Sequence, residues 1–518
     1  MARQVWLVRG SWLPVVCVCA GCATHAAPRT APDASVVQLR QDLSAIFDAP
    51  IMSHAQWAVD IRSIDRDQPL FSVNAGKLMM PASNMKILTL AGAAEILGWD
   101  ARLPTTLEAA GAVSDGVLHG DLVIRGTGDP TINTRNGRGV TVFADWANAL
   151  RTAGVRSIQG RIVGDDQAFD DEGIGGGWAW DYLQYGYAAP VGALQYNEDV
   201  AELVVSPGAT EREPAVIRLA PGTGLSVMNR TVTGAAGSAE TIDYKRHLDA
   251  PILDIVGSVP LGGKPVTRSV AVVNPTVFFA QSLKDALVEY GIEVSGEAVD
   301  LDDIAAQVDP AAERRVLTST ESPSLSEIAD VLMKVSQNLY AETLMKWIGR
   351  AEAGLGTFAA GRDAVQGMLR GWGIPDQSYV IADGSGLSRY NYVSAGALTA
   401  VLEKMYKDPN DRDRFLGALA VAGRDGTMAT RLRRTRAEGN AAVKTGSISN
   451  VRSLSGFIRT RDGEMLVFSI LANDFVVPSA TVNWITDLAV EVLANFTRGQ
   501  TGVRPGSDRG QTLGARAQ

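Results

Sequence analysis

The chain has 518 residues, of which 46% are hydrophobic and 20% are charged. This length accommodates roughly two to four domains of ~100–200 residues. The hydrophobic content is sufficient for sizeable cores, which excludes a mainly disordered chain or a long coiled coil. Lys and Arg total 48 against 57 for Asp and Glu, a formal net charge of −9 that argues against a nucleic-acid partner.

The first 22 residues predict an export signal. Two arginines precede the apolar stretch Trp12–Ala20, which is shorter than the ~20 residues needed to span a bilayer. Cys22 follows a small-residue pair that resembles a lipoprotein cleavage box, although Cys19 stands where Leu is usual. We therefore expect an exported, periplasmic protein. Peripheral membrane attachment through lipidation of Cys22 and plain secretion are both open.

The cysteines and histidines exclude several kinds of chemistry. All three cysteines lie within the signal segment, so the rest of the chain has no disulfide, thiolate nucleophile or Cys-based metal site. The four histidines form no His-x-x-His or His-Glu-x-x-His pair, which argues against a catalytic zinc. No Gly-x-Ser-x-Gly elbow precedes a helix. We expect neither a metal nor a cofactor.

The first elements in chain order are a hairpin and a helix. Residues 23–35 are rich in Ala, Pro and Thr and predict a linker. Alternating apolar residues in Trp57–Ile61 and in Leu70–Val73, with a polar turn between them, predict the hairpin. Pro81 then opens a helical pattern that ends near Gly98.

The middle of the chain, Leu103–Val316, consists of short β segments broken by glycine. Two stretches within it, Phe143–Asp166 and Val277–Asp303, both read as helix, Gly, strand. They are either a weak internal repeat or two unrelated units.

The last third of the chain is again mixed. Helical periodicity occupies Ser324–Arg350, a hairpin is predicted for Ser453–Thr460 and Met465–Ala472, and a helix is predicted for Ala480–Asn495. The resulting fold class is α+β, with an antiparallel sheet that joins both ends of the chain and a β-rich insertion of one or two subdomains. The expected division is signal 1–22, linker 23–35, first part of the main domain 36–102, insertion 103–316, second part of the main domain 317–497 and disordered tail 498–518.

The segment Pro81–Lys86 is the first candidate for chemistry. Ser83 and Lys86 are three residues apart at a helix start and share one face. A serine hydroxyl is a poor nucleophile unless a nearby base takes its proton, and a buried lysine can serve as that base. The helix N-terminus adds N–H groups and a positive dipole where an oxyanion would form.

Two further motifs follow in a fixed order. Ser336-Gln337-Asn338 places a hydroxyl and an amide between two helical stretches. Lys444-Thr445-Gly446-Ser447 begins a strand whose edge can pair with an extended peptide, and Gly446 permits close approach. Each motif is weak alone, but the order Ser-x-x-Lys, Ser-x-Asn, Lys-Thr-Gly is specific.

These motifs resemble those of penicillin-binding proteins and serine β-lactamases. The surrounding blocks are similar to the D-alanyl-D-alanine carboxypeptidase/endopeptidase family, the class C low-molecular-mass penicillin-binding proteins of peptidase S13 type. The resemblance runs from about Ser35 to Phe496 and includes the long interval between Ser83 and Ser336, where this family carries an insertion. Ser447 stands where Thr is usual and Gln337 where Asp is common. The blocks are GDLVIRGTGDPT, SQNLYAETLMK, DGSGLSR, VAGRDGTM and VKTGSISNVRSLSGF.

The resemblance implies a transpeptidase-like domain and a hydrolase of the D-Ala-D-Ala ends or cross-links of peptidoglycan stem peptides, inhibited by β-lactam antibiotics. It assigns Ser83 as nucleophile, Lys86 as general base, and Ser336 with Lys444 as the relay that protonates the leaving amine. The implied substrate-binding residues are Asn338, Thr445, Gly446 and Ser447.

Other candidate contacts come from the tryptophan-rich stretch GGWAWDYLQYGY. By resemblance, Asp181 and Tyr185 in this stretch, together with Arg389, contact the charged side chain of the stem peptide; a packed loop and a surface ion pair are the alternative. The alternative function is a β-lactamase or esterase on the same core. A catalytically idle wall-binding module is disfavoured because the motif residues are all present. The sequence leaves the oligomeric state open.

Overall fold

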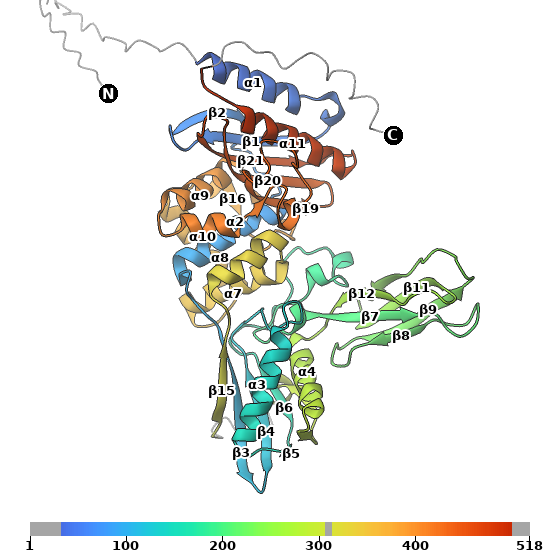
Figure 1. Ribbon diagram of the computed structural model, residues 1–518. Coiled ribbons are helices and arrows are strands. Elements are labelled where there is room, and N and C mark those ends of the chain that lie inside the picture. Colours follow the sequence, from blue (N-terminus) through green and yellow to red (C-terminus); the bar gives the residue numbers. More distant parts are fainter. Residues whose placement is uncertain (1–32, 306–312, 500–518) are drawn as a thin grey trace, which may run out of the picture.

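The computed structural model describes residues 33–305 and 313–499 (Figure 1). The predicted signal, Cys22, most of the linker and most of the tail lie outside these ranges. A six-stranded sheet with the order β18-β19-β20-β21-β1-β2 forms the centre of the main domain. All neighbouring pairs are antiparallel, and strands from both ends of the chain meet where β21 pairs with β1. The strands are β1 (Gln56–Ser63), β2 (Gln68–Val73), β18 (Ala420–Val421), β19 (Ala442–Ile448), β20 (Val451–Arg459) and β21 (Met465–Asn473).

Both faces of this sheet are covered by helices (Figure 1). One face packs against α1 (Ala34–Phe47) and α11 (Ser479–Asn495), and the other against a helical layer that includes α2 (Met85–Leu97). β21 is buried along its whole length because side chains on alternate sides enter both cores. The remaining helices of the second layer are α6 (Leu325–Asp330), α7 (Asn338–Ala353), α8 (Phe358–Gly371), α9 (Ala395–Lys407) and α10 (Arg412–Ala418), with a ribbon of β16 (Tyr379–Val380) and β17 (Tyr392–Val393).

Helix α1 begins at the end of the predicted linker and was not anticipated. Its buried residues Val36, Leu39, Leu43 and Phe47 recur at helical spacing and face the sheet. The side chain of Asp33 caps the helix by accepting from the N–H of Ser35.

The chain between α2 and α6 forms a second body built on a seven-stranded sheet, which lies below the helical layer in Figure 1. β3 (Pro104–Ser114) leads away from the main domain, and β15 (Arg315–Glu321) returns antiparallel to it. β15 therefore runs across residue 316, where the sequence placed the end of the insertion. The other elements are α3 (Arg138–Thr152), α4 (Pro275–Glu289), α5 (Leu301–Ile304), β4 (Val117–Arg125), β5 (Ser157–Ile158), β6 (Ile162–Asp165), β13 (Glu293–Val294) and β14 (Ala298–Asp300).

The two helix–Gly–strand units lie side by side in this body. β13 pairs in parallel with β5, and β14 with β6, while α3 and α4 share one hydrophobic core. A Cβ on Gly160 would lie 2.3 Å from the carbonyl oxygen of Gly120, and a Cβ on Gly296 would lie 2.2 Å from that of Gly160. Glycine at matching positions of the two units thus permits the close approach of neighbouring strands.

Two three-stranded sheets extend sideways from this body as an arm (Figure 1). Their facing side chains form a separate small core. The strands are β7 (Val200–Ser206), β8 (Val216–Leu219), β9 (Ser226–Gly234), β10 (Asp243–Arg246), β11 (Ile252–Pro260) and β12 (Val266–Ala271). Within the two described ranges, no helix is both long and apolar enough to cross a membrane.

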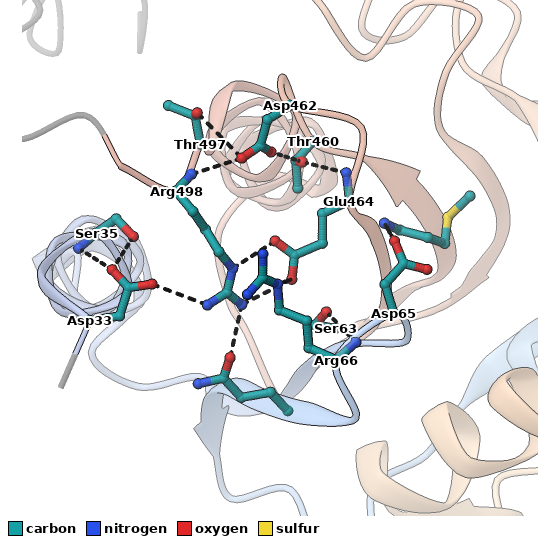
Figure 2. Close-up of polar contacts among 12 residues, drawn as sticks. Asp33, Ser35, Ser63, Asp65, Arg66, Thr460, Asp462, Glu464, Thr497 and Arg498 are labelled. Carbon is teal, nitrogen blue, oxygen red and sulfur yellow. Dashed lines mark hydrogen bonds and ion pairs between the residues drawn. The ribbon is translucent and has the colours of Figure 1, made fainter. Parts of the chain in front are cut away.

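A polar network ties the two ends of the described chain to the turn between β20 and β21 (Figure 2). Arg498 donates to both carboxylate oxygens of Glu464, at 2.8 and 2.9 Å, and to Asp33 at 3.2 Å. The Glu464 side chain is only 7% exposed. Arg66 also lies beside Glu464, at 3.6 Å, but its side chain is 58% exposed.

We expect Arg498→Met to lower the free energy of unfolding by about 2–3 kcal/mol, because it leaves a buried carboxylate without its bidentate partner. Arg66→Met is the matched control on the same carboxylate and should cost less than about 1 kcal/mol, as exposed ion pairs do. Chemical denaturation of both variants measures the difference. Equal losses would contradict the assignment of Arg498 as the main partner.

Candidate active site

Ser83 and Lys86 lie where the chain enters helix α2. Ala82–Asn84 forms a single 3₁₀ turn before the α-helix begins at Met85. The Lys86 ammonium donates to the Ser83 hydroxyl at 3.0 Å. Ser83 is partly exposed, whereas Lys86 is fully buried. The local sequence thus places a reachable hydroxyl directly on a buried amine.

The surroundings of Lys86 make it a candidate base. Its Nζ also donates to the Oδ1 of Asn338 at 2.6 Å and to the carbonyl of Ser385 at 2.8 Å. Burial lowers the pKa of Lys86 to about 7, although the carboxylates of Glu342 and Asp383 act in the opposite direction. A substantial fraction of this amine is therefore neutral near neutral pH.

Lys444 occupies a similar position on strand β19. It is fully buried, and its Nζ donates to the Ser336 hydroxyl and to the Thr445 carbonyl, both at 2.8 Å. Burial, followed by the charge of Lys86, lowers the pKa of Lys444 well below its usual value. The carbonyl of Lys444 accepts from the Asn84 side chain at 2.9 Å, which binds the strand to the nucleophile turn.

Gly446 brings β19 close to this turn. A Cβ at this position would lie 2.0 Å from the Ser453 hydroxyl oxygen, 2.8 Å from the Pro81 carbonyl oxygen and 3.0 Å from the Ser83 nitrogen. No side chain fits there. The strand edge and the Ser83 backbone can therefore face one substrate together.

The Ser336–Asn338 segment leads into α7, whose first residue is Asn338. A widened helical turn, Val331–Val335, precedes Ser336, which has a left-handed backbone with φ 67°. Asn338 bridges two parts of the molecule, because its Oδ1 accepts from Lys86 and its Nδ2 donates to the Tyr187 carbonyl of the insertion at 2.8 Å. The motif thus contacts both lysines and the insertion.

Two buried carboxyl groups that were not predicted from the sequence, Asp383 on the loop DGSGLSR and Glu342 on α7, order the surroundings of Lys86. Asp383 accepts from the N–H groups of Gly386 and Ser388 at 2.7 and 2.6 Å, and from the Trp178 indole at 2.9 Å. Glu342 accepts from the Ser385 N–H at 2.8 Å, and burial raises its pKa. The two carboxylates hold the loop that presents the Ser385 carbonyl to Lys86. In the sequence, the only local indication of this role is that Asp383 is followed by glycines at positions 384 and 386.

The three sequence motifs meet at a cleft of about 770 Å³. Beyond the motifs, one wall contains Arg452, Phe475 and Val476, which the sequence analysis did not single out. Arg452 donates to the Ile448 and Val451 carbonyls, and within the described ranges no ion pair joins it to a carboxylate. The motif residues that line the cleft are Ser83, Ser336, Asn338, Thr445 and Ser447.

The three remaining predicted residues surround this cleft without lining it. Asp181 is exposed, and Arg389 donates to the Ser449 carbonyl at 3.0 Å. Tyr185 stacks on Tyr187 with ring centroids 5.3 Å apart, and it is Tyr187 that reaches the cleft wall. Tyr185 thus lies behind Tyr187 and does not reach the surface of the cleft.

A separate acidic group could accommodate a cation. Oxygen atoms of Asp166, Asp300 and Asp302 lie within 4.8 Å of one another in the insertion, and none of these residues lines the cleft. Thr276 donates to Asp166 and Asn274 to Asp300, which ties the group to the start of α4.

A buried lysine hydrogen-bonded to a serine hydroxyl, at the start of a helix that packs beside an antiparallel sheet, is the active-site arrangement of penicillin-binding proteins. The family model described as D-Ala-D-Ala carboxypeptidase 3 (S13) matches residues 39–495. The chain belongs to this family, and the predicted family, fold class and serine hydrolase class are confirmed.

Individual relatives agree with this assignment. The chain is 35% identical to a D-alanyl-D-alanine carboxypeptidase of Actinomadura sp. (strain R39), over 86% of this chain and 82% of the relative. It is 26% identical to the carboxypeptidase DacB of Haemophilus influenzae, over 80% and 84% of the two chains. The crystal structure of penicillin binding protein 4 from Haemophilus influenzae superposes with a TM-score of 0.75 at 25% identity, over 89% of this chain and 99% of that one.

Proposed function

We propose that this protein hydrolyses D-Ala-D-Ala ends and D-amino-acid cross-links of peptidoglycan stem peptides through an acyl-enzyme on Ser83. The single observation that carries the proposal is the fully buried Lys86 ammonium, 3.0 Å from the Ser83 hydroxyl, with a pKa lowered to about 7. The neutral amine accepts the hydroxyl proton as Ser83 Oγ attacks the carbonyl carbon of the penultimate D-Ala.

The other motif residues complete the reaction. The N–H groups of Ser83 and Ser447 stabilise the oxyanion, and one such donor is worth ~3–4 kcal/mol. As the C–N bond breaks, Lys444 passes a proton through the Ser336 hydroxyl to the leaving amine. Water then hydrolyses the ester on Ser83. The 2.8 Å contact between Lys444 Nζ and Ser336 Oγ supports this path.

The strand edge binds the substrate. Thr445 and Ser447 hydroxyls, with the charge of Lys444, hold the terminal carboxylate, while Gly446 leaves room for the peptide. Asn338 holds the substrate amide. Thr445 already shares a hydrogen bond of 2.8 Å with Thr427, which orients its hydroxyl on the cleft wall.

The side chain of the stem peptide is proposed to reach the Trp-rich loop. Asp181 and Arg389 lie at that end and carry opposite charges, which suits a group that has both an amine and a carboxylate. Tyr185 supports Tyr187 by stacking, and Tyr187 contributes the apolar wall.

We also propose that the protein is exported and acts in the periplasm. Labelling with a fatty-acid probe tests whether Cys22 is lipidated.

The division into a main domain of residues 36–102 and 317–497 with an intervening insertion is proposed with one change. The insertion extends to Glu321, because β15 belongs to its seven-stranded sheet.

Digestion of purified peptidoglycan with mass analysis tests the activity. Loss of one alanine from monomers marks a carboxypeptidase, and conversion of dimers to monomers marks an endopeptidase.

A labelled penicillin should acylate the wild-type protein at Ser83 and should not label Ser83→Ala, because the β-lactam carbonyl meets the same nucleophile. Lys86→Arg should acylate at least about 10²-fold more slowly, since arginine stays protonated and cannot accept the proton. Mass spectrometry of the intact adduct and of its peptides gives both results. Label on another residue of Ser83→Ala would exclude the assigned nucleophile. Rapid release of the opened β-lactam would indicate the alternative lactamase.

The acylation rate should rise with pH through about 7, following deprotonation of Lys86. The rate rises with pH because only the free amine is a base. Below its pKa the Lys86 ammonium cannot accept the Ser83 proton, and above this pKa the base is fully available. Second-order acylation constants, measured over a pH series with circular dichroism as a folding control, test this. A rate that falls through this range would contradict Lys86 as the base.

Asp181→Asn should reduce turnover of stem-peptide mimics that carry a free side-chain amine by about 2- to 5-fold, because the charge pair with an exposed carboxylate is lost. Penicillin acylation should change less than about twofold, since penicillin lacks this amine. Parallel kinetics on both substrates measure the ratio. Equal losses, or none, would show that Asp181 has only a structural role.

A further inference from the structure

The insertion contacts helix α7 along the face that begins at the Ser336–Asn338 segment. Gln195 donates to Thr343 at 2.7 Å, and Lys346 donates to Asp170 at 2.6 Å. At the start of the helix, Glu198 of the insertion accepts from the Gln337 side chain at 2.6 Å. This last contact falls on the middle residue of the active-site segment.

Glu198 is held firmly on the insertion side. Arg135 donates to both of its carboxylate oxygens, at 2.8 and 2.6 Å. The Glu198 side chain is 11% exposed, whereas that of Arg135 is 47% exposed. A buried carboxylate with a bidentate arginine has a fixed position, so it can serve as an anchor for Gln337.

The backbone that carries Glu198 is unusual. Asn197, Glu198 and Asp199 are consecutive non-glycine residues with φ of 53°, 59° and 52°. L-residues visit this left-handed region as single residues rather than in runs. Such conformations persist only where the surroundings over-determine them, and they gather at functional sites. Here the Asn197 side chain fixes the turn by accepting from the Thr134 hydroxyl at 2.6 Å.

The segment on the other side of the contact is strained as well. Ser336 has φ 67°, and its hydroxyl must stay 2.8 Å from Lys444 Nζ. Gln337 follows at the N-cap of α7, where its Oε1 accepts from the Leu339 N–H at 3.3 Å while its Nε2 reaches Glu198. The Gln337 side chain therefore connects the left-handed turn of the insertion to the left-handed serine of the site.

We propose that Glu198 is a positioning residue: through Gln337 it holds Ser336 and Asn338 in the geometry that proton transfer requires. The inference rests on the proposed function, because it assigns Glu198 a part in acylation. It gives the insertion a role in the chemical step, beyond the wall of the substrate cleft. Gln337 suits this role because its carboxamide can donate to the Glu198 carboxylate and accept from the Leu339 N–H at the same time.

A double-mutant cycle on the two side chains tests the proposal. Gln337→Glu places two carboxylates against each other and should lower the rate constant of penicillin acylation by about 10- to 100-fold. In a Gln337→Leu background, Glu198→Ala should lower the rate by less than about threefold more, because Glu198 acts through Gln337. Glu240→Gln, on the exposed pair with Arg268 in the insertion, is the matched control and should leave the rate unchanged.

The readouts separate positioning from mere stability. The acylation rate constant should fall while the dissociation constant of the initial penicillin complex and the melting temperature stay near wild type. A large further loss from Glu198→Ala in the Gln337→Leu background, or an unchanged rate in Gln337→Glu, would overturn the proposal. If Gln337→Glu does not fold, Gln337→Leu gives the same test: slower acylation supports the positioning role, and an unchanged rate overturns it. Absence of label on wild-type Ser83 would instead overturn the proposed function itself.

Discussion

The structure depends on the burial of two lysine ammonium groups beside each other. Lys86 and Lys444 are both fully buried, and burial, followed by the charge of Lys86, lowers the pKa of Lys444. Removing an ammonium ion from water costs several kcal/mol even after relaxation. No carboxylate in the described ranges contacts either ammonium within ion-pair distance. The cost is offset by oriented neutral acceptors, and the fold must deliver each of them within about 3 Å.

Those acceptors come from segments that are far apart in the chain. Lys86 uses Ser83, Asn338 and Ser385, and Lys444 uses Ser336 and its neighbouring carbonyl. The central sheet brings β19 to the start of α2, and α7 packs against α2. Non-glycine residues at positive φ occur at Ala82 and Ser336, where the chain turns toward the lysines. At ~1–3 kcal/mol each, such conformations require support from the surrounding fold. Glu342 and Asp383 fix the loop that presents the Ser385 carbonyl, and the insertion contacts the Ser336–Asn338 segment through Glu198 and the Tyr187 carbonyl.

The sequence predicted the parts that chemistry or simple periodicity dictates. The motifs around Ser83, Ser336 and Lys444 could be recognised because acyl transfer needs those groups, and the hairpins follow from alternating side chains. Helix α1 was missed because the composition of the preceding linker obscured the spacing of Val36, Leu39 and Leu43. Tyr187 reaches the cleft and Tyr185 stacks behind it, a distinction that depends on the turn at Gly186. Contacts such as that between Glu198 and Gln337 join residues far apart in the chain, so no local sequence pattern predicts them.

The position of Lys444 in this pair also links substrate binding to the release of the leaving amine. Two interacting groups lose protons in steps that belong to the pair, and a charge on one disfavours a charge on the other. In the proposed reaction the substrate brings a carboxylate to Thr445 and Ser447, next to Lys444. That negative charge favours the ammonium form of Lys444. The same ammonium then supplies the proton that Ser336 passes to the leaving amine. An arginine at position 444 could hold the carboxylate but could not give up its proton.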